Sequence, residues 1–270
     1  MKNFIVKTEV EMDVYRSPES LFERVLKYKK VSSTQDIVKN IAKKNCGAVV
    51  VVCEQQVSGY GRFKRKWHSA KGGLWFSILL KPKVAINEFP KLSLLFAVAI
   101  KRVFCENYKI YCKIKWSNDI LIYGKKISGI LIESFCCNGF VFAAVGIGIN
   151  INNVIDKELR EFAVSLREVL GKEVNMDEFF NVLLEKIEKV YFDFEKSGFS
   201  QFVEEYNDSI AYKNEVVDIV DDIGESKNSG VNLGIDSSAA LLIETENKQI
   251  KRIISGTLRL ASKGLKTDEV

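Results

Sequence analysis

Short runs of branched apolar residues, bounded by glycine, proline or charged residues, divide the first 150 residues of the chain. The runs at 48–54, 73–81, 111–116, 120–123, 127–137 and 140–150 predict buried strands, and a weak alternation at 3–16 predicts an edge strand. Gly124-Lys125 and Asn138-Gly139 are hairpin turn signals between neighbouring runs. Strands joined by tight turns predict a largely antiparallel sheet.

Apolar residues three and four positions apart predict helices around these strands. The expected helices cover 18–28, 32–47, 91–107, 157–170 and 176–196, with a shorter helix continuing to about residue 207. Ser17, Pro18 and Glu19 give the first helix a capping hydroxyl, a proline at its first position and an acid in its first turn. The pattern therefore predicts an α+β fold, a mixed and largely antiparallel sheet with helices on one face.

The character of the chain changes after Ala211, where short strands with glycine- and aspartate-containing turns follow one another. Strands at 216–220, 230–233, 239–244 and 249–260 predict a small closing β-barrel, and we expect the tail from Ser262 to be frayed. The predicted domains are therefore 1–211 and 212–270.

Composition limits the classes of protein that the chain can represent. Of 270 residues, 47% are hydrophobic and 28% charged, the balance of a globular domain with a real core. No apolar run reaches membrane-spanning length and no secretion signal opens the chain, so we expect a cytoplasmic protein. Six cysteines without a C-x-x-C pair indicate reduced thiols, and a single histidine, His68, argues against a Ser-His-Asp or Cys-His site.

The first candidate for chemistry is the stretch 54–67, which leaves a predicted strand and carries Gly59 and Gly61. Arg62, Lys64, Arg65, Lys66 and Lys71 supply five positive charges within residues 59–71, with no acid among them. A flexible cationic loop beside a sheet can hold an anion. Alone, such a loop is more often a solvated turn or a nonspecific basic patch.

Four other stretches carry candidate ligand groups, each with a plain structural alternative. The three hydroxyls of residues 32–34 exceed what one helix cap needs, although simple capping is the alternative. Asn118-Asp119 places an amide beside a carboxylate, although turn formation alone explains this pair. Lys126 precedes a strand that contains Gly129, where a glycine permits close approach of a ligand. Gly146 and Gly148 leave one strand face bare, which suits either a bulky group or tight helix packing.

In their order along the chain, these motifs resemble the biotin protein ligase family. They are S-S-T-Q, E-Q-Q-x-x-G-x-G-R-x-x-R-K-W, K-W-S-N-D, G-K-K-I-S-G-I-L-I-E and V-G-I-G-I-N-I-N, and they cover about residues 32–152. The later G-I-D-S-S-A-A-L-L-I-E and S-G-T-L-R-L resemble that family's terminal SH3-like barrel. The resemblance implies a catalytic domain similar to class II synthetases. It also implies that biotin and ATP, carried with Mg²⁺, form biotinyl-5′-AMP before a carrier-domain lysine accepts the biotinyl group.

The resemblance also assigns roles to individual residues of this chain. Lys126 and Arg62 match the catalytic positions, and Asp119 matches a supporting carboxylate. The biotin-binding positions are Ser33, Thr34, Gln35, Gln56, Tyr60, Gly61, Arg62, Lys126 and Gly129, with Gly59 matching a further ligand-side glycine. The ATP-binding positions are Arg62, Arg65, Trp67, Asn118, Lys126 and Asn150, and no metal site is assigned. Trp67 matches either a structural or an adenine-side anchor. These roles make 54–67 a lid over the adenylate.

Three departures from the family pattern bear on the site. Tyr60 stands where the family usually has arginine, so retention of the adenylate is either weaker or supported by Lys64. Ser117 replaces a usual proline, which loosens that turn. Arg259 lies two positions early for the barrel arginine that reaches ATP and Ala261 fills the matching place, so Arg259 is left out of the predicted site.

Partners and alternatives follow from the same comparison. Only 32 residues precede Ser33, too few for the winged-helix domain of repressor-type ligases, so we expect no DNA-binding role and no membrane partner. A biotin carboxyl carrier protein domain is the expected protein partner, and a homodimer is possible because family members often form one. The alternatives are a lipoate or octanoate ligase or transferase, a nucleic-acid-binding module built on the basic loop, and a ligase that only binds.

Overall fold

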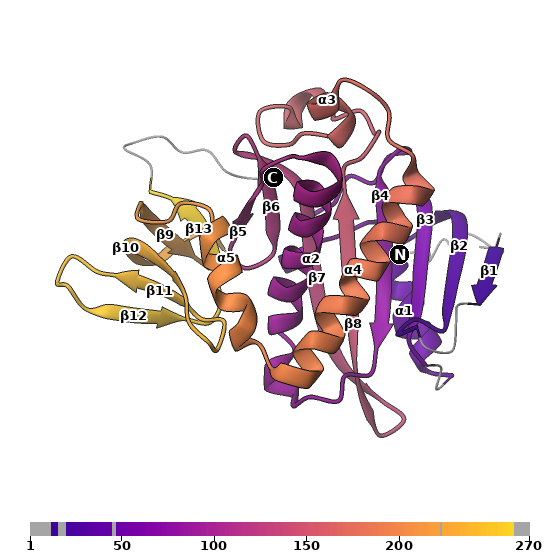
Figure 1. Cartoon of the computed structure of the whole chain (residues 1–270), viewed down its shortest axis with the longest axis horizontal. Helices are drawn as coiled ribbons and strands as arrows, with labels where there is room; N and C mark the ends of the chain where they lie inside the picture. Colours follow the sequence, from indigo (N-terminus) through magenta and orange to yellow (C-terminus); the bar gives the residue numbers. More distant parts are fainter. Residues whose placement is uncertain (1–11, 16–19, 45–46, 222, 262–270) are drawn as a thin grey trace.

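The computed structural model describes residues 12–15, 20–44, 47–221 and 223–261. Its larger sheet has eight strands in the order β1-β2-β3-β4-β8-β7-β6-β5 (Figure 1). They are β1 (Met12–Tyr15), β2 (Arg24–Val31), β3 (Val49–Gln56), β4 (Leu74–Leu80), β5 (Lys113–Lys115), β6 (Asp119–Ile122), β7 (Lys125–Cys137) and β8 (Phe140–Ile149). Among these described strands, β2 and β3 are the parallel pair and the other neighbours are antiparallel, as predicted.

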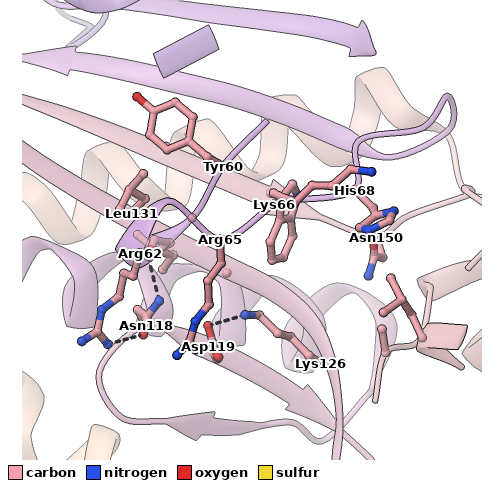
Figure 2. Close-up of a pocket in the computed structure, with 18 of the residues that line it drawn as sticks. Tyr60, Arg62, Arg65, Lys66, His68, Asn118, Asp119, Lys126, Leu131 and Asn150 are labelled. Carbon is pink, nitrogen blue, oxygen red and sulfur yellow. Dashed lines mark hydrogen bonds and ion pairs between the residues drawn. The ribbon is translucent and has the colours of Figure 1, made fainter. Parts of the chain in front are cut away.

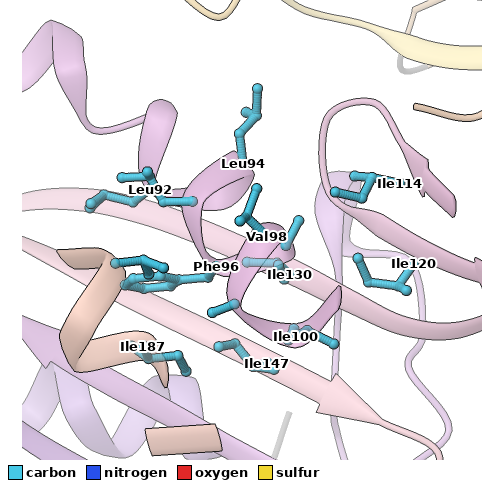
Figure 3. Packing of buried hydrophobic residues seen from close by; sticks show 14 of the residues in the cluster. Leu92, Leu94, Phe96, Val98, Ile100, Ile114, Ile120, Ile130, Ile147 and Ile187 are labelled. Atoms are coloured by element: carbon cyan, nitrogen blue, oxygen red, sulfur yellow. The ribbon is translucent and has the colours of Figure 1, made fainter. Parts of the chain in front are cut away.

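The main core lies between one face of this sheet and two long helices, α2 (Lys91–Tyr108) and α4 (Met176–Ser197). Successive side chains of a strand point to opposite faces, so Ile130 of β7 and Ile147 of β8 meet Phe96 of α2 in this layer (Figure 3). The prediction that the helices cover one face of the sheet holds for α2 and α4 but not for the shorter α1 (Thr34–Ala42). Helix α1 packs on the opposite face, against β3, β4 and β8.

The predicted helix at 18–28 is wrong where the structure describes it. Residues 24–31 form β2, which lies between β1 and β3. Val25 packs into the core under the long helices while Leu26 and Tyr28 pack on the α1 face, so both faces of β2 are covered. A strand buried on both faces loses its alternation, which is why its apolar spacing resembled that of a helix. The capping signal at 17–19 lies outside the described residues.

The predicted helix at 157–170 is also broken. A 3-10 turn (Lys157–Leu159) and the short α3 (Leu166–Leu170) are separated by a turn at 160–162 and by an isolated parallel bridge between Ala163 and Lys126 of the sheet. There the amide of Lys126 donates to the carbonyl of Phe162 at 2.7 Å, and the amide of Val164 donates to the carbonyl of Lys126 at 3.1 Å. Pairing with the start of β7 therefore outweighs local helix propensity.

The predicted continuation after α4 is present as a 3-10 turn (Ser200–Phe202) and α5 (Val203–Ser209). A second sheet of five antiparallel strands then follows, in the order β12-β11-β10-β9-β13. Its strands are β9 (Val216–Val220), β10 (Ser226–Ile235), β11 (Leu241–Glu244), β12 (Ile250–Ile253) and β13 (Thr257–Leu260). The single strand predicted at 249–260 is thus two strands, with Gly256 at φ 134° in the turn between them. The SH3-like classification and the domain boundary at 211/212 stay predictions.

Two further expectations concern helices and thiols. The described helices include none with the length and apolar character that crossing a membrane requires. Of the six cysteines, Cys46 lies outside the described residues and the five described ones are free thiols. Burial raises the pKa of both Cys53 and Cys112 to about 12, so these two thiols are protonated at neutral pH and behave as core side chains. The predicted tail from Ser262 also lies outside the described residues.

Candidate active site

A cavity of about 400 Å³ lies on the α1 face of the large sheet, beside the N-terminus of α1. Its walls come from α1, from the loop after β3, from β4, β6, β7 and β8, and from β13 of the second sheet. Every residue of the predicted catalytic, biotin-binding and ATP-binding sets lines this cavity, whereas Gly59 does not. Figure 2 shows Tyr60, Arg62 and Lys126 among the lining residues. The sequence motifs therefore meet in space, although their separate roles stay predictions.

One end of the cavity consists of uncharged polar groups. Ser33 is the N-cap residue of α1, but its side chain makes no capping hydrogen bond. The Oε1 atom of Gln56 in β3 accepts hydrogen bonds from the amide of Thr34 at 2.9 Å and from its hydroxyl at 3.1 Å. The Thr34 and Ser77 hydroxyls are 2.8 Å apart. Gln35 donates to the carbonyl of Ala144 at 3.0 Å, while its Oε1 is buried with no hydrogen-bond partner among the described residues. A buried acceptor of this kind suits a ligand N–H group.

The loop after β3 forms a small hairpin over the cavity, and we call residues 59–67 the lid. Its ends are joined by the Trp67 amide donating to the Gly59 carbonyl, and the Gly61 amide donates to the Arg65 carbonyl, both at 2.9 Å. Phe63 and Lys64 occupy the tip with positive φ angles of 56° and 58°, which suits the twist of a two-residue hairpin turn. A side chain at Gly59 would lie 2.6 Å from the Ser69 hydroxyl, so this glycine serves packing inside the protein.

Arg62 extends from the lid toward the nucleotide-side residues of the prediction. Its guanidinium donates to Asn118 Oδ1 at 3.1 Å and to the carbonyl of Gly256 at 2.8 Å, so it joins the lid to both sheets (Figure 2). Burial lowers the pKa of this guanidinium, an effect that the nearby Asp119 carboxylate opposes and Arg65 reinforces. A guanidinium whose pKa burial lowers in this way gains stability from an anion bound beside it.

A β-bulge directs Lys126 into the cavity. Asp119 of β6 pairs with Gly129 of β7, and Leu121 pairs with Lys126, so β7 contains one extra residue, Ile127, between these two pairs. Paired residues share a face, and the bulge therefore places Lys126 on the same face as Gly129 while Ile127 enters the main core. The ammonium of Lys126 lies 3.0 Å from Asp119 Oδ1 and 5.0 Å from the centroid of the Trp67 ring.

The bare strand face at Gly146 and Gly148 is covered by side chains of the chain itself. A Cβ atom at Gly148 would lie 2.5 Å from Trp67 Nε1, and one at Gly129 would lie 3.1 Å from the same indole. Trp67 therefore lies across two neighbouring glycines and meets the fully buried Trp75 edge-to-face at 6.3 Å between ring centroids. The planar group for which the sequence left room is, in this structure, Trp67.

The asparagines of the predicted nucleotide side are held by neighbouring groups. Asn118 donates to the carbonyl of Ile130 at 3.0 Å, and Asn153 donates to Asn150 Oδ1 at 3.0 Å. Both predicted asparagines are therefore oriented by bonds to protein atoms. The described residues contain no cluster of three or more His, Cys, Asp or Glu that could hold a metal ion by itself.

The structure also places residues at the cavity that the sequence prediction omitted or excluded. Arg259, which was left out because it lies two positions early in the family pattern, lines the cavity together with Thr257, two positions earlier on β13. His68 lines the rim and its Nδ1 lies 2.8 Å from Asp156 Oδ2. The period of two along β13 is a signal that could have placed Arg259 beside Thr257.

Lys64, the suggested substitute for the missing arginine, does not line the cavity among the described residues. Its ammonium lies 3.9 Å from the centroid of the Tyr60 ring and 3.7 Å from Glu133 Oε1. In this structure Lys64 therefore supports Tyr60 from outside and adds no direct cationic contact to the cavity.

The known proteins that this chain resembles in sequence include ligases. Residues 28–152 match the family model described as the biotin/lipoate A/B protein ligase family. The chain is 33% identical over 263 residues to the bifunctional ligase/repressor BirA of Bacillus subtilis, a match that covers 94% of this chain and 79% of that protein. It is 28% identical over 208 residues to the biotin–[acetyl-CoA-carboxylase] ligase of Paracoccus denitrificans, covering 73% of this chain and 84% of that one.

Among solved structures, the biotin protein ligase of Aquifex aeolicus in complex with biotin and ATP superposes with a TM-score of 0.78 at 32% identity. The match covers 87% of this chain and 97% of that chain.

Proposed function

Because the chain belongs to the biotin protein ligase family, we propose that it joins biotin to a lysine of a carrier protein at the expense of ATP. In the first step a carboxylate oxygen of biotin attacks the α-phosphorus of ATP, giving biotinyl-5′-AMP and releasing pyrophosphate. In the second step the neutral ε-amine of the carrier lysine attacks the acyl carbon, an amide bond forms and AMP leaves.

The observation that carries the proposal is the arrangement of charge in the cavity. Lys126 and Arg62 enter from β7 and from the lid, while the opposite end offers the neutral polar groups of Thr34, Gln35 and Gln56. An uncompensated carboxylate will not approach a triphosphate, so the first step needs cations where both anions meet. A neutral ureido ring needs uncharged donors and acceptors in a partly apolar slot. One cavity supplies both environments.

Each predicted residue then has a physical task in the proposed reaction. Lys126, held by Asp119, neutralises the biotin carboxylate and the α-phosphate, and Arg62 retains the adenylate beneath the lid. Arg65, Asn118 and Asn150 serve the nucleotide side, where Mg²⁺ enters bound to ATP and supplies further positive charge to the phosphates. A closed lid excludes water from the labile anhydride.

A second candidate is a lipoate or octanoate ligase or transferase of the same fold. The matching family model spans both biotin and lipoate enzymes, which is the observation that keeps this candidate open. A lipoyl group has no ureido ring, so it would leave the neutral polar end of the cavity without its partner. We therefore favour biotin.

The test is ATP–pyrophosphate exchange by the purified chain with biotin, with lipoate, or with neither. We expect exchange with biotin alone, and exchange that depends on lipoate alone would overturn the assignment. Lys126→Ala should reduce biotin-dependent exchange about 10³-fold, in the range found when a charge-stabilising donor is removed. Lys125→Ala is the matched control, because this neighbouring lysine donates to the carbonyl of Arg160 at 2.6 Å. Equal activity of the two variants would remove the role of Lys126.

Several finer expectations stay predictions. A biotin carboxyl carrier protein domain is the proposed acceptor, because its exposed lysine meets the requirement of the second step. The lack of a DNA-binding role stays a prediction, since relatives of this chain include bifunctional ligase/repressor proteins. Homodimer formation and a cytoplasmic location also stay predictions.

A further inference from the structure

We propose that Tyr60 positions the lid through a cluster of side chains from three elements, and that this cluster sets how long the acyl-adenylate remains bound. The members, which we call the Tyr60 cluster, are Asp36 and Lys39 of α1, Tyr60 and Lys64 of the lid, and Glu133 of β7. The proposal deepens the proposed function and rests on it, because it concerns release of that reaction's intermediate.

The Tyr60 hydroxyl is the meeting point of the cluster. It lies 2.9 Å from Asp36 Oδ1 and 3.2 Å from Glu133 Oε2, so these two carboxylates share its single proton, and it accepts from the Lys39 ammonium at 3.1 Å. One phenol thus contacts an acid and a base of α1 and an acid of β7. Because hydrogen bonds to charged groups are stronger than those between neutral groups, this hydroxyl is a strong attachment for the lid.

Charged partners fix the remaining groups around Tyr60. Lys39 lies 2.6 Å from Glu133 Oε2, and both side chains are about a quarter exposed, at 27% and 26%. Lys64 lies over the phenol ring and within 3.7 Å of Glu133. Burial alone would raise the pKa of Glu133, but hydrogen bonds from Lys39 and Gln35 and the charges of Lys39 and Lys64 lower it below the ordinary value. Glu133 is therefore an anion at neutral pH.

The lid depends on such side-chain contacts because no backbone–backbone hydrogen bond found in the described part of the chain joins it to another helix or strand. The backbone hydrogen bonds described for residues 60–66 run within the lid, including the bridge between Tyr60 and Lys66. At the nucleotide end Arg62 attaches the lid to Asn118 and Gly256. At the other end the Tyr60 cluster attaches it to α1 and β7. Tyr60 is thus a positioning residue that closes the biotin end of the cavity.

The tyrosine changes the chemistry of this attachment relative to an arginine. A guanidinium at position 60 would form ion pairs with Asp36 and Glu133, but it would lie beside two ammonium groups, Lys39 and Lys64. A neutral phenol supplies one proton, which the two carboxylates share, and adds no third positive charge. The retention of the adenylate therefore depends on the ring and hydroxyl of Tyr60 together with the lysines.

Release of labelled biotinyl-AMP from the preformed complex, chased with excess unlabelled biotin, tests the proposal. Tyr60→Phe and Glu133→Gln should each speed release about tenfold, as expected for loss of one hydrogen bond to a charged group. The double variant should be little faster than either single variant, because both changes remove the same contact. Glu106→Gln is the matched control, since its carboxylate pairs with Lys186 away from the cavity, and its effect should multiply independently with that of Tyr60→Phe.

Tryptic cleavage at the basic residues 62–66 of the ligand-free protein supplies a measurement that does not need the reaction. Cleavage should be about tenfold faster in Tyr60→Phe and Glu133→Gln than in the wild type or Glu106→Gln. Wild-type cleavage in both lid variants, or release rates that multiply without coupling, would overturn the proposal. If the wild type forms no adenylate from biotin and ATP, the proposed function fails, and cleavage still decides whether the cluster holds the lid.

Discussion

Gly148→Ala is the change whose effect the structure defines most directly, because one methyl group would enter the space of one ring. The new Cβ would lie 2.5, 2.6 and 2.8 Å from three atoms of the Trp67 indole, whereas ordinary contacts begin at 3.4 Å. The ring would have to retreat by about 1 Å, since closer approach is strongly repulsive.

The surroundings of Trp67 determine the direction of that retreat. Trp75 blocks one edge of the indole and is itself fixed by a 2.9 Å hydrogen bond from its ring N–H to the carbonyl of Ala70. The sheet lies beneath the ring at Gly129 and Gly148, and the ammonium of Lys126 lies 5.0 Å from its centroid, so we expect the ring to move away from the sheet and toward Lys126. The substitution thus displaces an aromatic wall and disturbs the principal cation of the proposed reaction.

Two magnitudes follow for Gly148→Ala. Inserting a methyl group into a packed site costs about 1–3 kcal/mol of stability, which lowers the melting temperature of a chain of this size by several degrees. Displacing reacting groups by about 1 Å can cost about 100-fold in rate, so biotin-dependent exchange should fall by about that factor. Catalysis should therefore suffer much more than folding.

Gly129→Ala provides the graded comparison for the same ring. Its Cβ would lie 3.1 Å from the indole and 3.2 Å from the flexible Cε of Lys126, so a shift of a few tenths of an ångström is enough. Exchange by Gly129→Ala should stay within about tenfold of the wild type. Combining Gly148→Ala with Trp67→Phe should restore stability, because the smaller ring removes the overlap. Equal exchange rates for Gly148→Ala and Gly129→Ala would refute this account of Trp67.

Two further predictions concern ionic contacts. Arg62→Ala should release the adenylate about 10–100-fold faster, because two charge-assisted hydrogen bonds are lost. The released adenylate should then label lysines of unrelated added proteins, which intact mass measures. Labelling confined to the carrier would contradict this prediction. Glu205 faces Arg102 at 2.6 Å; burial would raise its pKa, but the hydrogen bond and charge of Arg102 lower it below the ordinary value. The resulting stability should be present above pH about 4.5 and lost as pH falls through the lowered pKa, so Glu205→Gln should destabilise at pH 7 and matter little near pH 3 in denaturant titrations.

The sequence could predict the elements whose pattern is local. The strands from β3 to β8 and the helices α2 and α4 were predicted within a few residues, because their apolar runs and turn residues agree with the final structure. The predictions for 18–28 and 157–170 were wrong because pairing with a neighbouring strand decided their backbone. Such pairing depends on residues distant in sequence, which no local pattern contains.

The site shows the same division between local and distant information. The resemblance predicted Lys126 as a site residue, but it did not explain why this side chain faces the cavity. The reason is a single extra residue in β7, because a shift of one position moves a side chain to the other face of a sheet. The Tyr60 cluster combines positions 36, 39, 60, 64 and 133, which only the assembled sheet brings together. Arg259 was left out because it lies two positions early in the family pattern, and such spacing does not reveal where the turn at Gly256 places the following strand.

The two attachments of the lid act on different parts of the proposed intermediate. Arg62 is a partly buried cation that donates to the neutral oxygens of Asn118 and Gly256, and burial lowers the pKa of its guanidinium in spite of the nearby Asp119 carboxylate, so an anion bound beside it would stabilise its charge. The Tyr60 cluster balances its own charges, with Lys39 and Lys64 against Asp36 and Glu133, so it gains nothing electrostatic from the ligand. We therefore expect the Arg62 attachment to respond to the phosphate charge of the proposed intermediate more strongly than the Tyr60 cluster does. Adenylate formation should tighten the lid mainly through Arg62, and this asymmetry lets the lid hold the intermediate while its biotin end stays unchanged.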